Sequence, residues 1–314
     1  MANILITGAG LVGCNVARVL LSRGHQAVLF DRSPNQVYID SVVPGVPVVS
    51  AEVQDLATVI DTLQSHHIET IVHTAYLIGG SLRQRPYGGM RANIDGCLVL
   101  IEAARLCKLR RFVFTSTFGI YDWNQLPQAP ITEDFPVAGD NPYIACKIAS
   151  EKLISSLAKA YQLEFAILRL AQIYGRGHYL GGDFAGAAMH QALSAATAGN
   201  TVRLDPGVLT MNDYVYVNDV AEGVALACEK PLRHSLYNIG SGLLGSTHNV
   251  AAAIAAAFPS VKVDIHAAPI VGPFWRHEQI LDLSRSRQDL GFSPQYDLRA
   301  GIGDFVLDLS RCRE

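Results

Sequence analysis

The stretch Asn3–Leu21, which reads NILITGAGLVGCNVARVLL, decides the fold. Its first five residues, Asn3–Thr7, form an apolar run typical of a strand that is buried on both faces. Three glycines follow in the pattern G-x-G-x-x-G: Gly8, Gly10 and Gly13. They lead into the helical pattern of Val12–Ser22. A strand, a glycine turn and a helix in this order predict the first unit of a parallel α/β sheet.

The glycine turn and the acid beyond it predict a site for a dinucleotide. Glycine permits the tight turn and lets backbone N–H groups approach a pyrophosphate, while the helix N-terminus adds favourable partial charge. Asp31 follows the second apolar run, Gln26–Phe30, where a carboxylate would accept both ribose hydroxyls of NAD and repel the 2′-phosphate of NADP. The adjacent Arg32 could hold that phosphate, although a solvated surface arginine is the simpler interpretation. We therefore expect NAD as the cofactor, with NADP less favoured.

The composition excludes several other classes of protein. The chain has 314 residues, 17% of them charged, and a net charge of -3, so nothing indicates nucleic acid or a membrane surface as a partner. The apolar N-terminus lacks the basic segment of a signal peptide, and Arg18 and Arg23 interrupt any membrane span. Neither an H-E-x-x-H motif nor a C-x-x-C pair occurs, so no metal is expected. Reduced thiols in a cytoplasmic protein are the simplest interpretation of the six cysteines: Cys14, Cys97, Cys107, Cys146, Cys228 and Cys312.

The first half of the chain alternates β-branched runs with helical patterns. This rhythm predicts an α/β fold with a Rossmann-type, doubly wound parallel sheet. The expected strands are Asn3–Thr7, Gln26–Phe30, Val46–Val49, Thr70–His73, Arg111–Ser116 and Glu164–Leu168. The expected helices are Val12–Ser22, Leu56–Ser65, Met90–Cys107 and Tyr143–Tyr161.

The rhythm weakens after Tyr174. A glycine-rich loop is expected at Gly175–Gly186, and two later runs, Asp213–Val217 and Leu236–Ile239, are expected to return to the sheet. Further helices are expected at Ala187–Ala198, Asp219–Glu229, Val250–Phe258 and Leu298–Leu309. Residues 1–174, with returning segments in 211–240, are thus predicted to form the dinucleotide-binding domain, and 175–210 and 241–314 a smaller C-terminal substrate-binding lobe.

The segment Asn141–Lys152, NPYIACKIASEK, carries the candidate chemistry. Tyr143 and Lys147 are four residues apart and share one face of a helix. Using a tyrosine phenolate near pH 7 requires a pKa shift of about 3 units, or about 4 kcal/mol. A nearby ammonium favours the phenolate, and so does the positive charge of oxidised nicotinamide. The pair therefore predicts a proton-transfer site.

Together these features resemble the extended short-chain dehydrogenases/reductases, the NAD-dependent epimerase/dehydratase family, over nearly the whole chain. The segments that carry the resemblance are IVHTAY (Ile71–Tyr76), the N-x-x-G pattern at Asn93, FTSTFGIY (Phe114–Tyr121), LRLAQIYG (Leu168–Gly175), DYVYVNDVA (Asp213–Ala221), YNIG (Tyr237–Gly240) and LGFSP (Leu290–Pro294). The resemblance implies a homodimer through the helices at Met90–Cys107 and Tyr143–Tyr161.

The resemblance also implies roles for single residues. Tyr143 would be the general acid/base, Lys147 would bind ribose hydroxyls and lower the tyrosine pKa, and Thr117 would hydrogen-bond the reacting oxygen, with Ser116 as the alternative. The candidate cofactor-binding residues are Gly8, Gly10, Leu11, Val12, Gly13, Asp31, Arg32, Glu52, Val53, Thr74, Ala75, Asn93, Tyr143 and Lys147. The candidate substrate-binding residues are Tyr76, Ser81, Ser116, Thr117, Gln172, His178 and Tyr179.

Four departures from the family pattern restrict the reaction. The glycine turn is one residue shorter than the usual G-x-x-G-x-x-G, and Gln172 replaces an asparagine. Asn212 stands where sugar-nucleotide enzymes often carry an arginine for the diphosphate, although Arg203, Arg276 or Arg285 could compensate. Finally, Phe118 and Gly119 follow Thr117 where 4,6-dehydratases carry an acidic pair, so we reject a dehydratase.

Three functions stay open, in order of preference. The first is a dehydrogenase or reductase acting on a secondary alcohol or ketone of a small polar or sugar-like molecule. The second is an epimerase of a sugar or sugar nucleotide, which begins with the same step and then returns the hydride to the opposite face. The third is a dinucleotide-sensing regulator, disfavoured because Tyr143 and Lys147 are both present.

Overall fold

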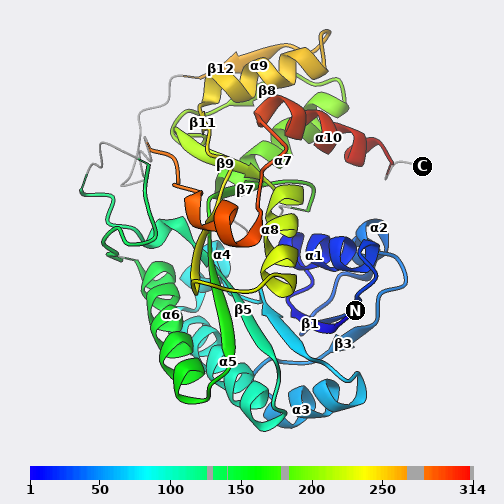
Figure 1. Cartoon of the computed structure of the whole chain (residues 1–314). Helices are drawn as coiled ribbons and strands as arrows, with labels where there is room; N and C mark the ends of the chain where they lie inside the picture. Colours follow the sequence, from blue (N-terminus) through cyan, green and yellow to red (C-terminus); the bar gives the residue numbers. More distant parts are fainter. Residues whose placement is uncertain (126–129, 140, 178–183, 267–278, 312–314) are drawn as a thin grey trace.

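The computed structural model describes residues 1–125, 130–139, 141–177, 184–266 and 279–311. Seven parallel strands form the main sheet in the order β3-β2-β1-β4-β5-β6-β10, and the predicted Rossmann-type fold is confirmed (Figure 1). The chain runs outward from β1 in both directions, which is the doubly wound arrangement. The strands are β1 (Asn3–Thr7), β2 (Gln26–Asp31), β3 (Val48–Ser50), β4 (Thr70–His73), β5 (Arg111–Thr117), β6 (Glu164–Leu170) and β10 (Leu236–Ile239).

The glycine turn joins β1 to helix α1 (Leu11–Ser22). At two of its three glycines, Gly8 and Gly13, there is no space for a side chain. Gly8 has a φ of +91°, and a Cβ there would lie 2.8 Å from the amide nitrogen of Ala75, just after β4. A Cβ at Gly13 would lie 1.8 Å from the carbonyl oxygen of Gly8, so only glycine lets the helix approach this closely. A Cβ at Gly10 would meet nothing within 4 Å. The turn therefore holds α1 tightly and leaves open space beside Gly10.

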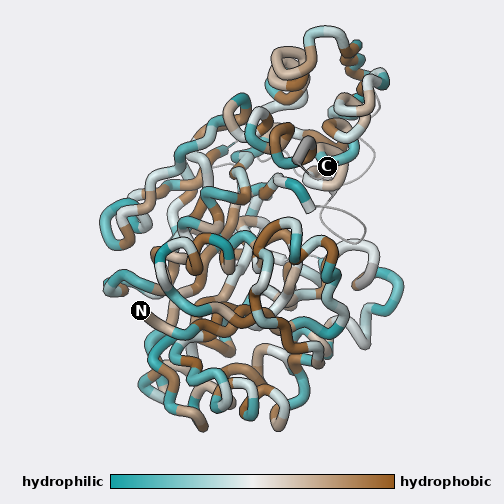
Figure 2. The backbone as a smooth tube through the Cα atoms, turned by 90° about the vertical axis from the view of Figure 1, so that its right-hand side faces the viewer, coloured by the Kyte–Doolittle hydropathy of each residue, from teal (hydrophilic) through white to brown (hydrophobic). Residues whose placement is uncertain are grey.

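Helices cover both faces of the main sheet (Figure 1). The helices are α3 (Leu56–Ser65), α5 (Pro86–Leu106) and α6 (Pro142–Ala160) on one face, and α1 and α8 (Val217–Glu229) on the other. Along β1, Ile4 and Ile6 belong to one apolar core and Leu5 to the other. Figure 2 shows hydrophobic chain gathered in the interior of the sheet domain. Burial on both faces explains the continuous apolar runs of these strands.

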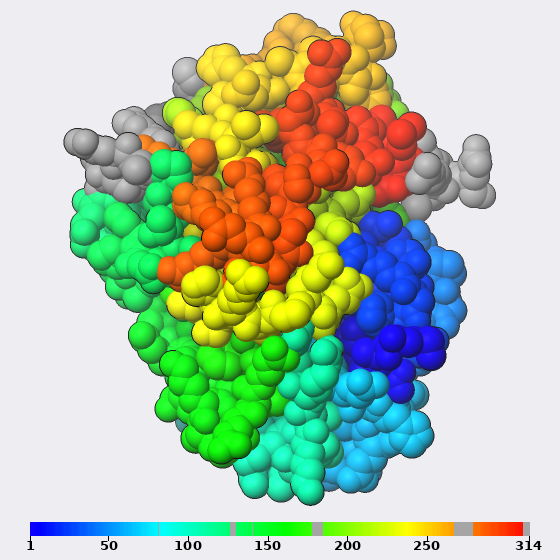
Figure 3. Space-filling model, in the orientation of Figure 1, coloured from blue at the N-terminus to red at the C-terminus, as the bar shows by residue number. Residues whose placement is uncertain are grey.

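The last third of the chain builds most of a smaller lobe with its own apolar core (Figure 1). Met189, Leu193, Ile302 and Phe305 are fully buried in this core. Residues 279–297, orange in Figure 3, cross the visible face between the lobe and α8. The elements of the lobe are β7 (Gln172–Tyr174), α7 (Phe184–Thr197), β8 (Val202–Leu204), β9 (Asn212–Tyr216), β11 (Leu244–Gly245), α9 (Thr247–Ala257), β12 (Val263–Ile265) and α10 (Leu298–Arg311).

One of the two expected returns to the sheet is wrong. The run Asp213–Val217 lies mainly in β9, which pairs with β7 and β11 in a separate small sheet, whereas Leu236–Ile239 joins the main sheet beside β6 as predicted. The cause is packing, because Tyr214 and Tyr216 belong to the core of the lobe and Val215 to the core of the sheet domain. Strand β9 therefore lies between the two cores, and the division into domains stays a prediction.

The remaining elements are short, and no helix among the described residues is long and apolar enough to cross a membrane. They are α2 (Gln36–Val42), α4 (Gly79–Gln84), η1 (Phe118–Ile120) and η2 (Ser286–Leu290). The loop expected at Gly175–Gly186 already becomes helical at Phe184. The five described cysteines are free.

Candidate active site

Helix α6 positions the tyrosine–lysine pair. It begins at Pro142, where the missing N–H costs nothing because the first turn has no partner for it. The side chain of Asn141 caps this end by accepting a hydrogen bond from the backbone N–H of Ile144 at 3.0 Å. Tyr143 and Lys147 therefore lie one turn apart at the start of the helix, beside the end of β5.

Lys147 is buried with its ammonium among aromatic rings. Its side chain is only 4% exposed, and Nζ donates a hydrogen bond to the carbonyl oxygen of Thr115 at 2.7 Å. The same nitrogen lies 3.7 Å from the ring centroid of Tyr76, 4.5 Å from that of Phe114 and 6.0 Å from that of Tyr143. Burial lowers the pKa of Lys147 to about 7, because the charged form loses its hydration. A lysine that titrates near neutral pH suits proton chemistry.

This burial predicts a pH-dependent stability that Lys147→Met removes. The unfolded lysine keeps its proton up to a pKa of about 10.5, so between about pH 7 and 10.5 the unfolded state binds more protons than the folded state. The free energy of unfolding should rise across this window, by at most about 1.4 kcal/mol per pH unit, and Lys147→Met should lack this rise. Urea unfolding of both proteins between pH 7 and 9 measures the difference, and parallel curves would contradict it.

The carboxyl end of β5 presents the two hydroxyls predicted to meet the substrate. Thr117 is half-buried, and its Oγ1 accepts a hydrogen bond from the N–H of Gly119 at 3.2 Å. Ser116 is buried, and its Oγ has no hydrogen-bond partner in the described part of the chain. A Cβ at Gly119 would lie 2.9 Å from Ile144 Cδ1, so this glycine lets η1 and the start of α6 meet. The structure thereby brings the end of β5 against the helix turn that carries Tyr143.

The glycine turn fits the pyrophosphate of a dinucleotide. The open space beside Gly10 lies at the N-terminus of α1, where backbone N–H groups attract anions. Asp31 lies beside this turn, since one of its carboxylate oxygens accepts a hydrogen bond from the N–H of Ala9 and the other from that of Ser33, both at 2.8 Å. These residues would hold the pyrophosphate and the adenosine ribose of NAD.

Four further cofactor candidates, Arg32, Glu52, Val53 and Thr74, make contacts within the protein. Arg32 forms an exposed ion pair with Glu52 at 3.9 Å, so its guanidinium already has a partner. Thr74 donates through Oγ1 to the carbonyl oxygen of Thr7 at 2.7 Å and thereby fixes the segment beside Gly8. Val53 fills the space left by Gly96, with Cγ2 only 2.9 Å from the position of a Cβ there.

Asn93 holds backbone with both ends of its amide. Its Oδ1 accepts a hydrogen bond from the N–H of Leu77 at 2.7 Å, and its Nδ2 donates to the carbonyl oxygen of the same residue at 3.0 Å. In this structure Asn93 therefore anchors the loop after β4 to helix α5.

Several substrate candidates cannot be placed. His178 and Tyr179 lie outside the described residues, and so does the side chain of Ser81, whose backbone belongs to α4. Gln172 begins β7, where the chain leaves the main sheet for the lobe. Tyr76 lies against the pair itself, with its ring edge-on to that of Tyr143 at a centroid distance of 6.0 Å.

Two polar residues around the pair, His73 and Ser150, were not among the residues predicted from the sequence. His73 is buried at the end of β4, and its Nδ1 lies 2.7 Å from Thr7 Oγ1 while its Nε2 has no partner in the described region. Burial, reinforced by the charge of Lys147, lowers the pKa of His73 to about 3, so this ring stays neutral. Ser150, one turn after Lys147, contacts Tyr76 Oη at 3.1 Å. The sequence signal that could have identified His73 is its polar side chain at the end of the apolar run Thr70–His73, next to the predicted site.

The position expected to grip a diphosphate carries no charge. Asn212 is buried, its Nδ2 donates to Thr210 Oγ1 at 2.9 Å, and its Oδ1 has no partner in the described part of the chain. Of the arginines that could compensate, Arg276 lies outside the described residues, and Arg285 is paired with Asp134 and Glu133. Arg203 lines a hollow of about 370 Å³ between α7 and the segment after β8.

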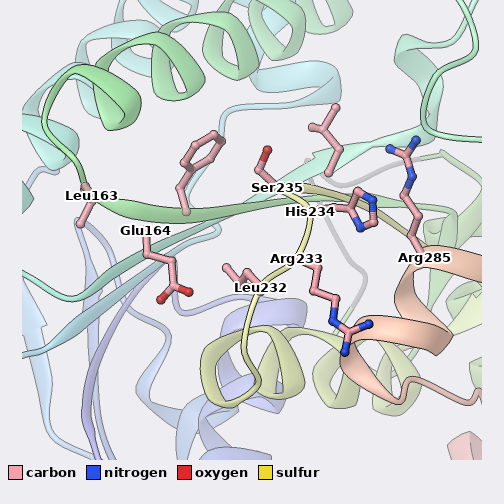
Figure 4. Close-up of a pocket in the computed structure, with 9 residues that line it drawn as sticks. Leu163, Glu164, Leu232, Arg233, His234, Ser235 and Arg285 are labelled. Carbon is pink, nitrogen blue, oxygen red and sulfur yellow. The ribbon is translucent and has the colours of Figure 1, made fainter.

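A second hollow, of about 470 Å³, lies away from the pair (Figure 4). It is lined at the starts of β6 and β10 by Glu164, Arg233 and His234, among others. Because parallel strands all start at the same edge, this hollow lies at the opposite edge from Thr117 and Tyr143. Figure 4 shows Arg233 and His234 pointing in different directions. Among the described residues no cluster of His, Cys, Asp or Glu is placed to hold a metal ion.

Comparison with known proteins gives the family. Residues 4–240 match the model of the NAD dependent epimerase/dehydratase family. The UDP-glucose 4-epimerase of Mycolicibacterium smegmatis is 30% identical over 96% of each chain. The dTDP-L-rhamnose 4-epimerase of Burkholderia thailandensis is 27% identical over 96% of this chain and 93% of its own. The crystal structure of Thermus thermophilus UDP-glucose 4-epimerase in complex with NAD has a TM-score of 0.84 at 26% identity, covering 98% of this chain and 99% of that one.

The fold and the tyrosine–lysine pair define a short-chain dehydrogenase/reductase of the extended type. The chain belongs to the NAD-dependent epimerase/dehydratase family, a family of enzymes. The resemblance inferred from the sequence motifs is thereby confirmed.

Proposed function

We propose that this enzyme is an NAD-dependent 4-epimerase of a sugar nucleotide. The observation that carries the proposal is full-length similarity to 4-epimerases, 30% and 27% identical over 96% of this chain, combined with the tyrosine–lysine pair on α6 beside the end of β5. The sequence favoured net dehydrogenation and held epimerisation second. The relatives favour the opposite order. The sequence separates the two functions poorly, because net oxidation and epimerisation share the same residues around the reacting carbon.

The residues suit the shared first step. Tyr143 takes the proton of a secondary hydroxyl, and the Lys147 ammonium nearby favours the phenolate that this requires. The Thr117 hydroxyl donates a hydrogen bond to the reacting oxygen and keeps it in place. Bound NAD would supply the hydride acceptor and donor. Inversion is complete when the keto sugar presents its other face, where the reduced nicotinamide would return the hydride to the carbon, and Tyr143 gives its proton back to the oxygen.

Asp31 should determine which dinucleotide is bound. Asp31→Asn keeps an acceptor for the N–H of Ala9 but loses the charge that grips ribose hydroxyls and repels a phosphate. Since a charge-assisted hydrogen bond contributes about 1.5–3 kcal/mol, we expect NAD affinity to fall about 10- to 100-fold while NADP affinity changes less. Fluorescence titration with both nucleotides measures the ratio, and an unchanged preference would contradict the assignment.

A dehydrogenase remains the second candidate because of Asn212. An enzyme that grips a diphosphate gains from a cation, and this position holds a buried amide instead. Incubation with sugar nucleotides, sugar acids and polyols separates the two functions. An epimerase changes sugar stereochemistry without accumulating reduced nicotinamide, whereas a dehydrogenase accumulates it in step with substrate loss.

We also propose a homodimer in the cytoplasm, formed through α5 and α6. Leu98 and Leu106 on α5 are 36% and 47% exposed, which leaves apolar surface on this helix. Sedimentation should give twice the mass of 33.9 kDa. A single-chain mass at micromolar concentration would contradict the dimer.

A further inference from the structure

Tyr76 occupies a position that the reaction just described does not use. It follows β4 by three residues, and its ring lies closer to the Lys147 ammonium than any other ring described, with Nζ 3.7 Å from the centroid. The hydroxyl of Tyr76 lies 3.1 Å from Ser150 Oγ, and Cys97 Sγ on α5 donates to the same oxygen at 3.3 Å. Tyr76 is therefore tied to the helix that carries the lysine, and its ring orientation is fixed.

A ring face at this distance stabilises a cation. The π-electrons present partial negative charge, and the attraction grows when the cation is removed from water, as it is at a side chain only 4% exposed. The carbonyl oxygen of Thr115 accepts one of the three ammonium protons. The ring centroid of Phe114 lies 4.5 Å from Nζ and 6.2 Å from the ring centroid of Tyr76, so two aromatic rings meet the ammonium on adjacent sides.

The other groups around the ammonium act in both directions. Glu151, on the same helix, and the thiols of Cys97 and Cys146 favour the charged form, but burial outweighs them and the pKa of Lys147 falls to about 7. His73 on β4 also interacts with Lys147 and stays neutral. At this balance a modest contribution from a ring decides whether the lysine is charged at neutral pH.

We propose that Tyr76 is a positioning residue for Lys147, whose ring face keeps the ammonium charged and directed toward Tyr143. This role rests on the proposed catalytic function of the pair, and it differs from the substrate contact expected from the sequence. The Tyr76 hydroxyl serves only to hold the ring through Ser150. A phenylalanine at position 76 should therefore preserve the effect, and an aliphatic residue of similar reach should lose it.

Nuclear magnetic resonance of the cofactor-free protein tests this directly. The chain has six lysines, so labelling lysine at Cε gives six signals, and Lys147→Met identifies the one from Lys147. The pH titration of that signal is then compared in wild type, Tyr76→Phe and Tyr76→Leu. We expect Tyr76→Leu to lower the titration midpoint by about one pH unit and Tyr76→Phe to leave it within a few tenths.

Equal midpoints in Tyr76→Leu and wild type, or an equal drop in Tyr76→Phe and Tyr76→Leu, would overturn the proposal. If Tyr76→Leu does not fold, as judged by thermal melting, Tyr76→Met supplies a flexible side chain without a ring face and takes its place. Because the titration needs neither cofactor nor substrate, it decides the role of Tyr76 even if the proposed reaction is wrong. Where activity is found, Tyr76→Leu should lose turnover several-fold at pH 7.5 and regain it at lower pH.

Discussion

Tyr143→Phe should abolish nearly all turnover while leaving the fold and cofactor binding intact. Removal of a positioned acid/base group costs typically 10²- to 10⁴-fold in rate, and the phenyl ring keeps the edge-on contact with the ring of Tyr76. The variant should therefore match the wild type in thermal stability and in NAD affinity. Steady-state turnover with a sugar nucleotide measures the loss.

The matched control is Tyr161→Phe, the same substitution at the end of the same helix. Tyr161 caps the opposite end of α6 from Tyr143, and the guanidinium carbon of Arg105 lies 5.3 Å from the centroid of its ring. Turnover of this control should equal that of the wild type. If Tyr143→Phe kept more than about a tenth of wild-type turnover, the tyrosine would not be the proton-transfer group.

Gly13→Ala should have the second large effect, on both stability and cofactor binding. The new methyl carbon would lie 1.8 Å from the carbonyl oxygen of Gly8, so helix α1 must move away from β1. Overpacking typically costs about 1–3 kcal/mol, and a contact this short belongs at the upper end of that range. The shifted helix N-terminus would also no longer meet a pyrophosphate. Urea unfolding and NAD titration measure the two losses.

Gly10→Ala separates binding from packing in the same turn. Gly10 has a φ of -97° and a ψ of -159°, which alanine also adopts, and its methyl would enter open space. Stability should therefore stay within about 0.5 kcal/mol of wild type, while NAD affinity falls because the methyl occupies space expected for the pyrophosphate. Unchanged NAD affinity in Gly10→Ala would place the pyrophosphate elsewhere.

The sequence predicted those helices and strands whose apolar pattern is clear and has distinct ends. Leu56–Ser65, Thr70–His73 and Leu236–Ile239 begin and end where expected, because their apolar patterns are bounded by polar or turn residues. Strands of three residues, such as β7, β8 and β12, show no alternation that a sequence can reveal. The sequence of strand β9 does not differ from that of a strand of the main sheet. Only the packing of Tyr214 and Tyr216 in the core of the lobe places β9 in the smaller sheet.

The parts of the candidate site that could be predicted are those whose residues lie at fixed separations along the chain. The glycine turn and the Tyr143–Lys147 pair are motifs with fixed separations, so they could be found without a structure. The ring of Tyr76 over Lys147 and the pairing of Arg32 with Glu52 could not, because each joins residues from different elements. The substrate is harder still to predict from the sequence, since net oxidation and epimerisation use the same residues around the reacting carbon.

The most direct test follows the hydrogen on the reacting carbon. The sugar nucleotide that the enzyme epimerises, carrying deuterium at carbon 4, is incubated with the enzyme and NAD, and the product is examined by mass spectrometry and nuclear magnetic resonance. We expect the 4-epimer of that sugar nucleotide to retain the deuterium at carbon 4, because the hydride leaves and returns within one active site. Deuterium lost to water, or deuterium accumulating on free nicotinamide without epimerised sugar, would contradict it.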